Sequence, residues 1–280
     1  MNTEPFERVL LATQGTKFDA AAEDVALALA SRPGIRLAAV YPEVSNPEYV
    51  SVAPELAARA EIAASRVLDG LRARAAQQGV QIEGRVRLGE EPFFEIVEEA
   101  RARAADLIVI RNRGKRGALL RLLVGDIAAR VIGQAPCHVL SVPQEARMWG
   151  KRLLLATDGS PHSVAAATLA AKVARSYGLV VLVVSAVEEG HSAEWRAQAG
   201  QFVADTAGEL ARAGLAAEGR VVEGRPHEAV IRQAREWGSD LIVLGSHGRT
   251  GLTKLQMGST TERVVGLATC PILIAKLQQP

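Results

Sequence analysis

The sequence has few cysteines, few aromatic residues and no long apolar run. Two cysteines in 280 residues do not make a disulfide framework. No apolar segment reaches the ~18 residues that a membrane helix needs, and a net charge of +2 gives no reason to expect a nucleic-acid or membrane partner. The N-terminal residues, Met-Asn-Thr-Glu-Pro, lack the apolar core of a signal peptide. We therefore expect a cytoplasmic globular protein.

Several motifs of catalytic and binding sites are also missing. The chain has neither a Walker A sequence nor the Gly-x-Gly-x-x-Gly pattern of dinucleotide-binding proteins. The histidines at 138, 162, 191 and 227 show no metal-ligand spacing with each other or with the cysteines. Asp158, Ser160 and His162 are close in sequence, but such neighbours cannot align as nucleophile, base and orienting acid. We predict no catalytic triad and no metal site made by the protein alone.

What the sequence does contain is an internal duplication. Residues 6–15 match 150–159, residues 105–110 match 239–244, and residues 135–140 match 268–273. Cys137 and Cys270 occupy equivalent positions in the two copies, and we expect them to fill space at the start of a last strand. The matches divide the chain into a first repeat, residues 1–144, and a second repeat, residues 150–280, joined by a short polar linker.

Each repeat alternates short apolar segments with amphipathic ones. This pattern predicts an α/β fold, in which a parallel sheet is covered by helices on both faces. On such sheets, ligands bind at the carboxyl ends of the strands, near the point where the strand order reverses. The expected strands are residues 8–13, 36–41, 80–88, 106–110 and 138–142, then 152–157, 180–187, 217–222, 241–244 and 272–275. The expected helices are residues 16–31, 54–78, 92–104 and 126–133, then 161–177, 193–213, 226–237 and 260–267.

A glycine-rich segment, residues 245–259, joins a strand to a helix in the second repeat. Glycines allow the backbone to approach a ligand closely, and the N–H groups at a helix N-terminus favour an anion such as phosphate. Ser259 and Glu262 have the spacing of a capping box, with Ser259 as the expected N-cap. Asp158 stands at the carboxyl end of another strand, where it can accept hydrogen bonds from ribose hydroxyls or help to hold a phosphate-bound metal. The same residues also suit an ordinary turn and helix start, and the pattern alone leaves both interpretations open.

Gly245, Gly248, Gly258 and Ser259 fit the spacing Gly-x2-Gly-x9-Gly-Ser/Thr. With this motif and the duplication, the chain resembles a tandem universal stress protein over essentially its whole length. The resemblance implies a five-stranded parallel sheet of order 3-2-1-4-5 in each repeat, of the adenine-nucleotide alpha-hydrolase type. It implies adenine at the backbone of Ala186, and frequent dimerisation. The nucleotide-binding residues expected on these grounds are Asp158, Ala186, Leu244, Gly245, His247, Gly248, Arg249, Gly258, Ser259 and Thr260.

The first repeat departs from the motif. Gln14 stands where Asp158 stands, and Arg111 replaces the first glycine of the loop. Asp126, an expected N-cap, occupies the hydroxyl position and places a carboxylate where phosphate oxygens would lie. Basic residues in the same loop could offset this repulsion or bind another anion: Arg111, Arg113, Lys115, Arg116 and Arg121. We expect a first repeat that no longer binds ATP and serves packing or partner binding.

The expected function is regulation in a stress response. We expect the second repeat to bind ATP, AMP or ADP, with or without Mg²⁺, and at most slow hydrolysis. The alternatives are a signalling or structural module without nucleotide, and an adenylating enzyme, for which residues 156–160 lack the usual Ser-Gly-Gly loop. The last strands of the two repeats, residues 138–142 and 272–275, are apolar edges and should pair into an intramolecular pseudo-dimer. Homodimers would then use other surfaces.

Overall fold

The computed structural model describes residues 4–112, 126–249 and 257–277. The first repeat contains five strands, β1 (Arg8–Ala12), β2 (Arg36–Val44), β3 (Ile82–Gly89), β4 (Leu107–Asn112) and β5 (His138–Pro143). Its helices are α1 (Ala20–Ala30), α2 (Pro47–Val52), α3 (Pro54–Gln77), α4 (Pro92–Ala102) and α5 (Asp126–Gln134). The second repeat contains β6 (Arg152–Ala156), β7 (Val180–Val187), β8 (Ala217–Glu223), β9 (Leu241–Gly245) and β10 (Ile272–Ala275). Its helices are α6 (Pro161–Tyr177), α7 (Ala193–Arg212), α8 (Pro226–Trp237) and α9 (Ser259–Leu267).

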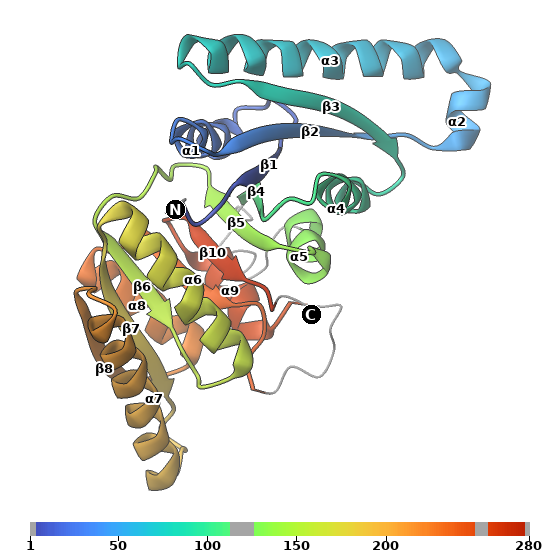
Figure 1. Ribbon diagram of the computed structural model, residues 1–280. Helices are drawn as coiled ribbons and strands as arrows, with labels where there is room; N and C mark the ends of the chain where they lie inside the picture. The colour runs from blue at the N-terminus through green and yellow to red at the C-terminus, as the bar shows by residue number, and fades with distance from the viewer. Residues whose placement is uncertain (1–3, 113–125, 250–256, 278–280) are drawn as a thin grey trace.

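All these strands form one ten-stranded sheet, in the order β3-β2-β1-β4-β5-β10-β9-β6-β7-β8. Each repeat therefore has the expected parallel order 3-2-1-4-5. The two halves meet where β5 and β10 pair antiparallel, with Leu140 opposite Leu273. This is the pairing that the apolar edge strands predicted. Figure 1 shows the first repeat, in blue to green, above the second, in yellow to red, with β5 and β10 between them.

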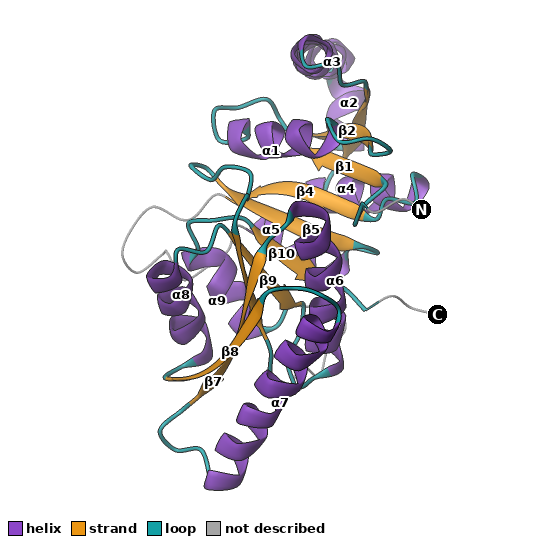
Figure 2. Ribbon diagram, turned by 60° about the vertical axis from the view of Figure 1, so that its left-hand side comes forward, coloured by secondary structure: helices purple, strands orange, loops and turns teal. Residues whose placement is uncertain are grey.

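Two apolar layers cover the sheet, one on each face. One layer contains Val25 of α1, Leu68 of α3, Val173 of α6 and Leu210 of α7. The opposite layer is made by α4, α5, α8 and α9. Figure 2 shows the strands as a single layer between these helices. The central strands are buried on both faces, which explains why they are continuous apolar blocks in the sequence.

The junction between the repeats also has polar contacts. The ammonium of Lys276, just after β10, donates to the carbonyls of Ile132 and Gly133 at 2.9 and 2.8 Å. These carbonyls lie near the C-terminus of α5, where a helix favours a cation. The Asn112 amide donates to the carbonyl of Val265 in α9. Through these hydrogen bonds, each repeat contacts the last helix of the other. Burial lowers the pKa of the Lys276 ammonium to about 8.

Three details of the predicted elements were wrong. The short helix α2, which lies between β2 and α3, was not predicted. The first helix begins after Asp19 rather than at Thr16, because the Asp19 carboxylate accepts the N–H and hydroxyl of Thr16, both at or below 2.8 Å, and holds a turn there. Asp126 is a helical residue of α5 rather than its N-cap. Within the described ranges, no helix combines the length and the apolar character of a membrane span.

Candidate functional site

A pocket of about 480 Å³ opens at the carboxyl ends of β6, β7 and β9 in the second repeat. The ten residues expected to bind the nucleotide all line this pocket: Asp158, Ala186, Leu244, Gly245, His247, Gly248, Arg249, Gly258, Ser259 and Thr260. They come from four separate parts of the chain. The volume lies in the range typical of small-molecule sites. The structure therefore brings the predicted residues together, whereas their individual roles in binding stay predictions.

Asp158 joins two loops at the edge of this pocket. Its Oδ1 accepts the backbone N–H of Ser160 at 3.0 Å, and its Oδ2 accepts the backbone N–H of Arg249 at 3.1 Å. Gly159 follows with φ +74°, a left-handed conformation that favours glycine. Ser160 is the N-cap of α6, and its hydroxyl accepts the N–H of Ser163 at 3.2 Å. The turn thus fixes the carboxylate near the loop that follows β9.

Each motif glycine in this loop is closely approached by other atoms. A Cβ on Gly245 would lie 2.7 to 2.8 Å from atoms of His162, including its backbone. A Cβ on Gly248 would lie 2.8 Å from Oδ2 of Asp158. A Cβ on Gly258 would meet the backbone of His247 and Ser246 at 3.2 and 3.3 Å. Glycine at these positions therefore lets the chain close around the pocket.

The expected capping box at the start of α9 is wrong. The N-cap is Gly258, and Ser259 is the first helical residue, without a side-chain cap. The N–H of Gly258 donates to the carbonyl of Ser246 at 3.0 Å, which ties the two ends of the loop together and sets where the helix begins. The Thr261 hydroxyl adds a second tie, to the Gly245 carbonyl at 2.9 Å. The first turn of α9 faces the pocket, because Ser259, Thr260 and Thr261 all line it.

Two histidines, His162 of α6 and His247 of the loop, lie beside Ser246. The buried hydroxyl of Ser246 is 3.3 Å from Nδ1 of His162 and 3.1 Å from Nδ1 of His247. The imidazole rings are 5.0 Å apart. Burial and then the nearby His247 lower the pKa of His162, so its neutral form is favoured at neutral pH. The His162 ring is thus engaged with Ser246, and the Asp158 carboxylate with backbone N–H groups.

The beginning of α7 closes another side of the pocket, and the sequence did not single it out. Trp195 lines the pocket, its ring lies 4.4 Å from the guanidinium of Arg249, and His191 packs on it edge to face at 5.4 Å. Ser192 is the N-cap of α7 and accepts the N–H of Trp195 at 3.2 Å. The sequence signal that could have pointed to this region was an aromatic residue in the first turn after a serine N-cap. The other lining residues that the sequence missed include Ser163, Pro226, Val230, Met257 and Thr261.

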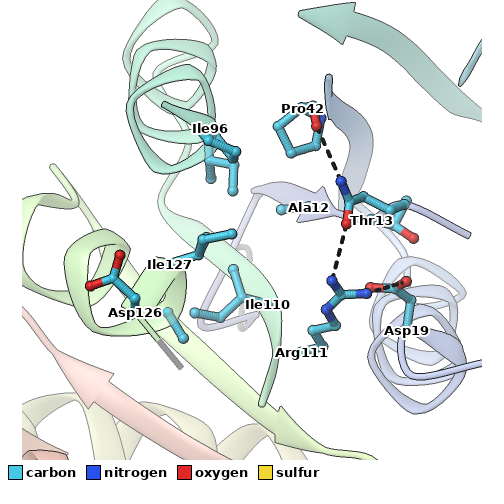
Figure 3. Close-up of a pocket in the computed structure, with 12 residues that line it drawn as sticks. Ala12, Thr13, Asp19, Pro42, Ile96, Ile110, Arg111, Asp126 and Ile127 are labelled. Atoms are coloured by element: carbon cyan, nitrogen blue, oxygen red, sulfur yellow. Dashed lines mark hydrogen bonds and ion pairs between the residues drawn. The ribbon is translucent and has the colours of Figure 1, made fainter. Parts of the chain in front are cut away.

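The equivalent place in the first repeat holds a smaller pocket of about 230 Å³ (Figure 3). Arg111 and Gln14, which replace Gly245 and Asp158, are hydrogen-bonded to each other at 3.1 Å. Gln14 also donates to the carbonyl of Pro42 at 3.4 Å. The strand registers place Pro42 where the second repeat has Ala186, because both lie two residues beyond the last pairs of β1 with β2 and of β6 with β7.

These replacements change what the first-repeat pocket can hold. Proline has no N–H, so the backbone donor available at Ala186 is missing at Pro42. Arg111 donates to the buried Asp19 carboxylate at 2.7 Å, and its side chain lines the pocket at the position of a motif glycine. Asp126 lines the same pocket with an exposed carboxylate. Of the remaining basic residues of this loop, Arg113, Lys115, Arg116 and Arg121 lie outside the described residues.

The cysteines are packed as expected. Cys137 is buried in the apolar layer under α5, and Cys270 packs against the same layer. Burial raises the pKa of both thiols to about 12, which makes them poor nucleophiles and poor metal ligands at neutral pH. In residues 4–112, 126–249 and 257–277, no group of three His, Cys, Asp or Glu side chains could hold a metal ion.

Comparison with known proteins gives one consistent family. A universal stress protein of Thermus aquaticus is 33% identical over 137 residues, which is 45% of this chain and 98% of that protein. One of Methanocaldococcus jannaschii is 38% identical over 68 residues, and this match covers 24% of this chain and 42% of its relative. A solved universal stress protein of Archaeoglobus fulgidus shares the fold, with a TM-score of 0.74 and 18% identity over 96% of this chain and 98% of that one. The universal stress protein family model matches residues 5–143 and again residues 150–276, so the chain belongs to this family and carries two copies of its domain.

Proposed function

We propose that the second repeat binds an adenine nucleotide, with ATP as the leading candidate, and that the protein acts as a regulator in a stress response. The observation that carries this proposal is the convergence of all ten expected nucleotide-binding residues on one pocket at the carboxyl ends of parallel strands. The helix N-terminus at α9, whose N-cap Gly258 has no side-chain cap, adds backbone N–H groups and a favourable dipole for phosphate.

The pocket supplies a partner for each part of the ligand. The phosphates would lie against Gly248, Gly258 and the first turn of α9, where no Cβ blocks the backbone. Asp158 would accept the ribose hydroxyls, and Ala186 would offer its backbone to the base beside Leu244. His247 and Arg249 lie on the phosphate side, and Arg249 adds a positive charge there. A Mg²⁺ ion would be held chiefly by the phosphates, with Asp158 as the nearby carboxylate.

We assign one nucleotide site to each chain. The first repeat lacks the backbone donor at Pro42, and Arg111 lines its pocket where the second repeat has a motif glycine. Its exposed Asp126 would repel phosphate. On this proposal the second repeat binds the nucleotide, and the first repeat packs against it through β5 and β10.

The proposed output is a change in surface rather than in chemistry. A bound nucleotide would stabilise the loop between Gly245 and Ser259, which Asp158 and Thr261 already connect to β6 and β9. A loop ordered in this way can present a different surface to a partner or to a second copy of the chain. Because β5 and β10 already cover each other's edges, a homodimer would use other surfaces. The cytoplasm is the proposed location of the protein.

Calorimetric titration with ATP, combined with mass spectrometry of ligand released from the denatured protein, tests the proposal. We expect one site per chain and an adenine nucleotide in the released fraction. Two equivalent sites would contradict the assignment to the second repeat. If a protein that circular dichroism shows to be folded gives no heat of binding and releases no nucleotide, the result would favour a signalling module without nucleotide.

A further inference from the structure

We propose that the first-repeat pocket, lined by β1, β4, α4 and α5, binds a small uncharged ring compound in place of a nucleotide. This inference concerns a different site from the proposed nucleotide pocket and does not depend on it. It rests on a juxtaposition that Figure 3 shows: an isoleucine-lined wall faces a chain of hydrogen-bonded polar side chains.

The apolar wall comes from three different elements. Ile96 of α4, Ile110 of β4 and Ile127 of α5 point toward the centre of the pocket in Figure 3. Ile96 and Ile110 are almost fully buried, whereas Ile127 keeps 43% of its surface exposed. A ligand that covers an apolar side chain exposed beside a cavity removes it from water, which favours binding.

The polar wall is a continuous chain of partners. Gln14 donates to the Pro42 carbonyl and accepts from Arg111, and Arg111 in turn pairs with Asp19. These contacts involve three residues that replace Ala186, Asp158 and Gly245 of the second repeat. The replacements bond to one another, so the wall is ordered without a ligand and has amide and guanidinium groups along its edge. A pre-formed wall of this kind favours a ligand that presents a hydrogen-bonding edge.

Among the described lining residues, charge disfavours a phosphate and favours a neutral ligand. The Arg111 guanidinium is balanced by the buried Asp19 carboxylate at 2.7 Å. Asp126 adds an exposed carboxylate at the first position of α5, so the described lining has a net negative charge. An anion within ~4 Å of that carboxylate would be repelled.

Size narrows the ligand class further. The pocket volume is about 230 Å³. An apolar cavity of about 150 Å³ is known to bind benzene, so the larger pocket suits a compound of about two fused rings. An indole-sized molecule has this size, no charge and one N–H that the Pro42 carbonyl or the Gln14 amide oxygen can accept.

The full-length chain can be tested with 5-fluoroindole, followed by ¹⁹F NMR line broadening. We expect saturable binding that Ile127→Glu weakens at least tenfold, because this change puts a charge on the apolar wall at an exposed site that tolerates it. The matched control is Ile62→Glu on α3, an isoleucine with 53% exposure that is far from the pocket lining. Absence of saturable binding, or equal binding by wild type and Ile127→Glu, would overturn the proposal.

Two further arms identify the site and the charge preference. Thr260→Glu alters the equivalent position of the second repeat and should weaken ATP without changing 5-fluoroindole binding. If Thr260→Glu abolishes 5-fluoroindole binding, the compound occupies the second pocket and the inference is wrong, whatever the fate of the ATP proposal. The anionic 5-fluoroindole-2-carboxylate should bind at least tenfold more weakly than 5-fluoroindole. Equal or tighter binding of the anion would show an anion site instead.

Discussion

The Asp158 carboxylate accepts the backbone N–H of Arg249 at 3.1 Å, across 91 positions of sequence. This single contact joins the turn after β6 to the loop after β9. Gly248 must be glycine for it to form, because a Cβ there would lie 2.8 Å from the same carboxylate oxygen. The arrangement explains why a carboxylate and a glycine loop occur together in the second repeat, and why Gln14 accompanies a changed loop in the first.

Asp158→Asn should weaken ATP binding by about tenfold or more. The amide keeps one acceptor oxygen but loses the charge and part of the hydrogen-bonding capacity that ribose hydroxyls would use, and hydrogen bonds to charged groups contribute about 1.5–3 kcal/mol. Titration calorimetry measures the affinity. Asp126→Asn, in the first-repeat pocket, is the matched control and should leave ATP affinity unchanged. A larger effect from Asp126→Asn than from Asp158→Asn would place the nucleotide in the first repeat and contradict the proposal.

Gly258→Asp should abolish ATP binding and leave the fold intact. Its backbone φ of −61° suits any residue, and aspartate is a good N-cap, so α9 should still form. However, the new side chain would press on the His247 backbone and put an anion where phosphate is expected. Gly70→Asp on α3, where an added Cβ meets nothing within 4 Å, is the control for a glycine replaced elsewhere. Circular dichroism confirms folding, and unchanged ATP affinity in folded Gly258→Asp would contradict the phosphate site.

The stability of the chain should fall in mild acid, partly through His138 at the junction of the repeats. Burial lowers the pKa of His138 from 6.5 to about 4, and its Nδ1 accepts a hydrogen bond from the backbone N–H of Lys276 at 3.1 Å. Between pH 6.5 and 4 the unfolded chain therefore binds a proton that the folded chain does not. Stability is present above pH 6.5 and is lost as the pH falls, by about 1–2 kcal/mol at pH 5.

Urea unfolding at pH 7.5 and pH 5 measures this loss. His138→Asn keeps an acceptor oxygen but does not titrate, so the difference between the two pH values should shrink in this variant. His191→Asn is the control, since His191 lies in a loop of the second repeat. An equal pH dependence in wild type and His138→Asn would show that other groups cause the acid loss.

Much of the fold could be predicted because its signals are local. Buried parallel strands are short apolar blocks, and the duplication fixes their equivalence, so β1, β6, β4 and β9 were found nearly in place. The pocket lining followed for the same reason: the motif residues stand at strand ends, and the carboxyl ends of parallel strands meet at one edge of the sheet. Ala186 and Leu244, which have unremarkable side chains, came only from the family resemblance.

What could not be predicted depends on contacts between distant segments. Ser259 has capping-box spacing, but the bond from the Gly258 N–H to Ser246 decides where α9 begins. The stacking of Arg249 on Trp195 joins residues 54 positions apart, which no periodicity reveals. Likewise, the identity of Pro42 matters only once the strand registers show that it occupies the position of Ala186 in the second repeat. Local patterns specify elements, whereas such contacts specify their ends and their neighbours.

The pairing of β5 with β10 should make the middle of the sheet its most protected part. Both strands are buried and hydrogen-bonded on two sides, whereas β3 and β8 are the outer edges. Amide exchange followed by mass spectrometry should therefore show slow exchange in His138–Pro143 and Ile272–Ala275, and faster exchange in the two outer strands. Exchange at β5 and β10 as fast as at β3 and β8 would contradict the intramolecular pairing.

Lys276→Ala should loosen this junction specifically. Removal of the ammonium leaves the carbonyls of Ile132 and Gly133 without their donor and takes a cation from the C-terminal turn of α5. Exchange should then accelerate in β5, β10 and α5, while β2 and β7, which pair within their own repeats, should keep wild-type rates. Lys151→Ala, at an exposed position before β6, controls for loss of a lysine. Uniform acceleration across all strands would instead indicate that the two repeats unfold as one unit, with no separate opening of the junction.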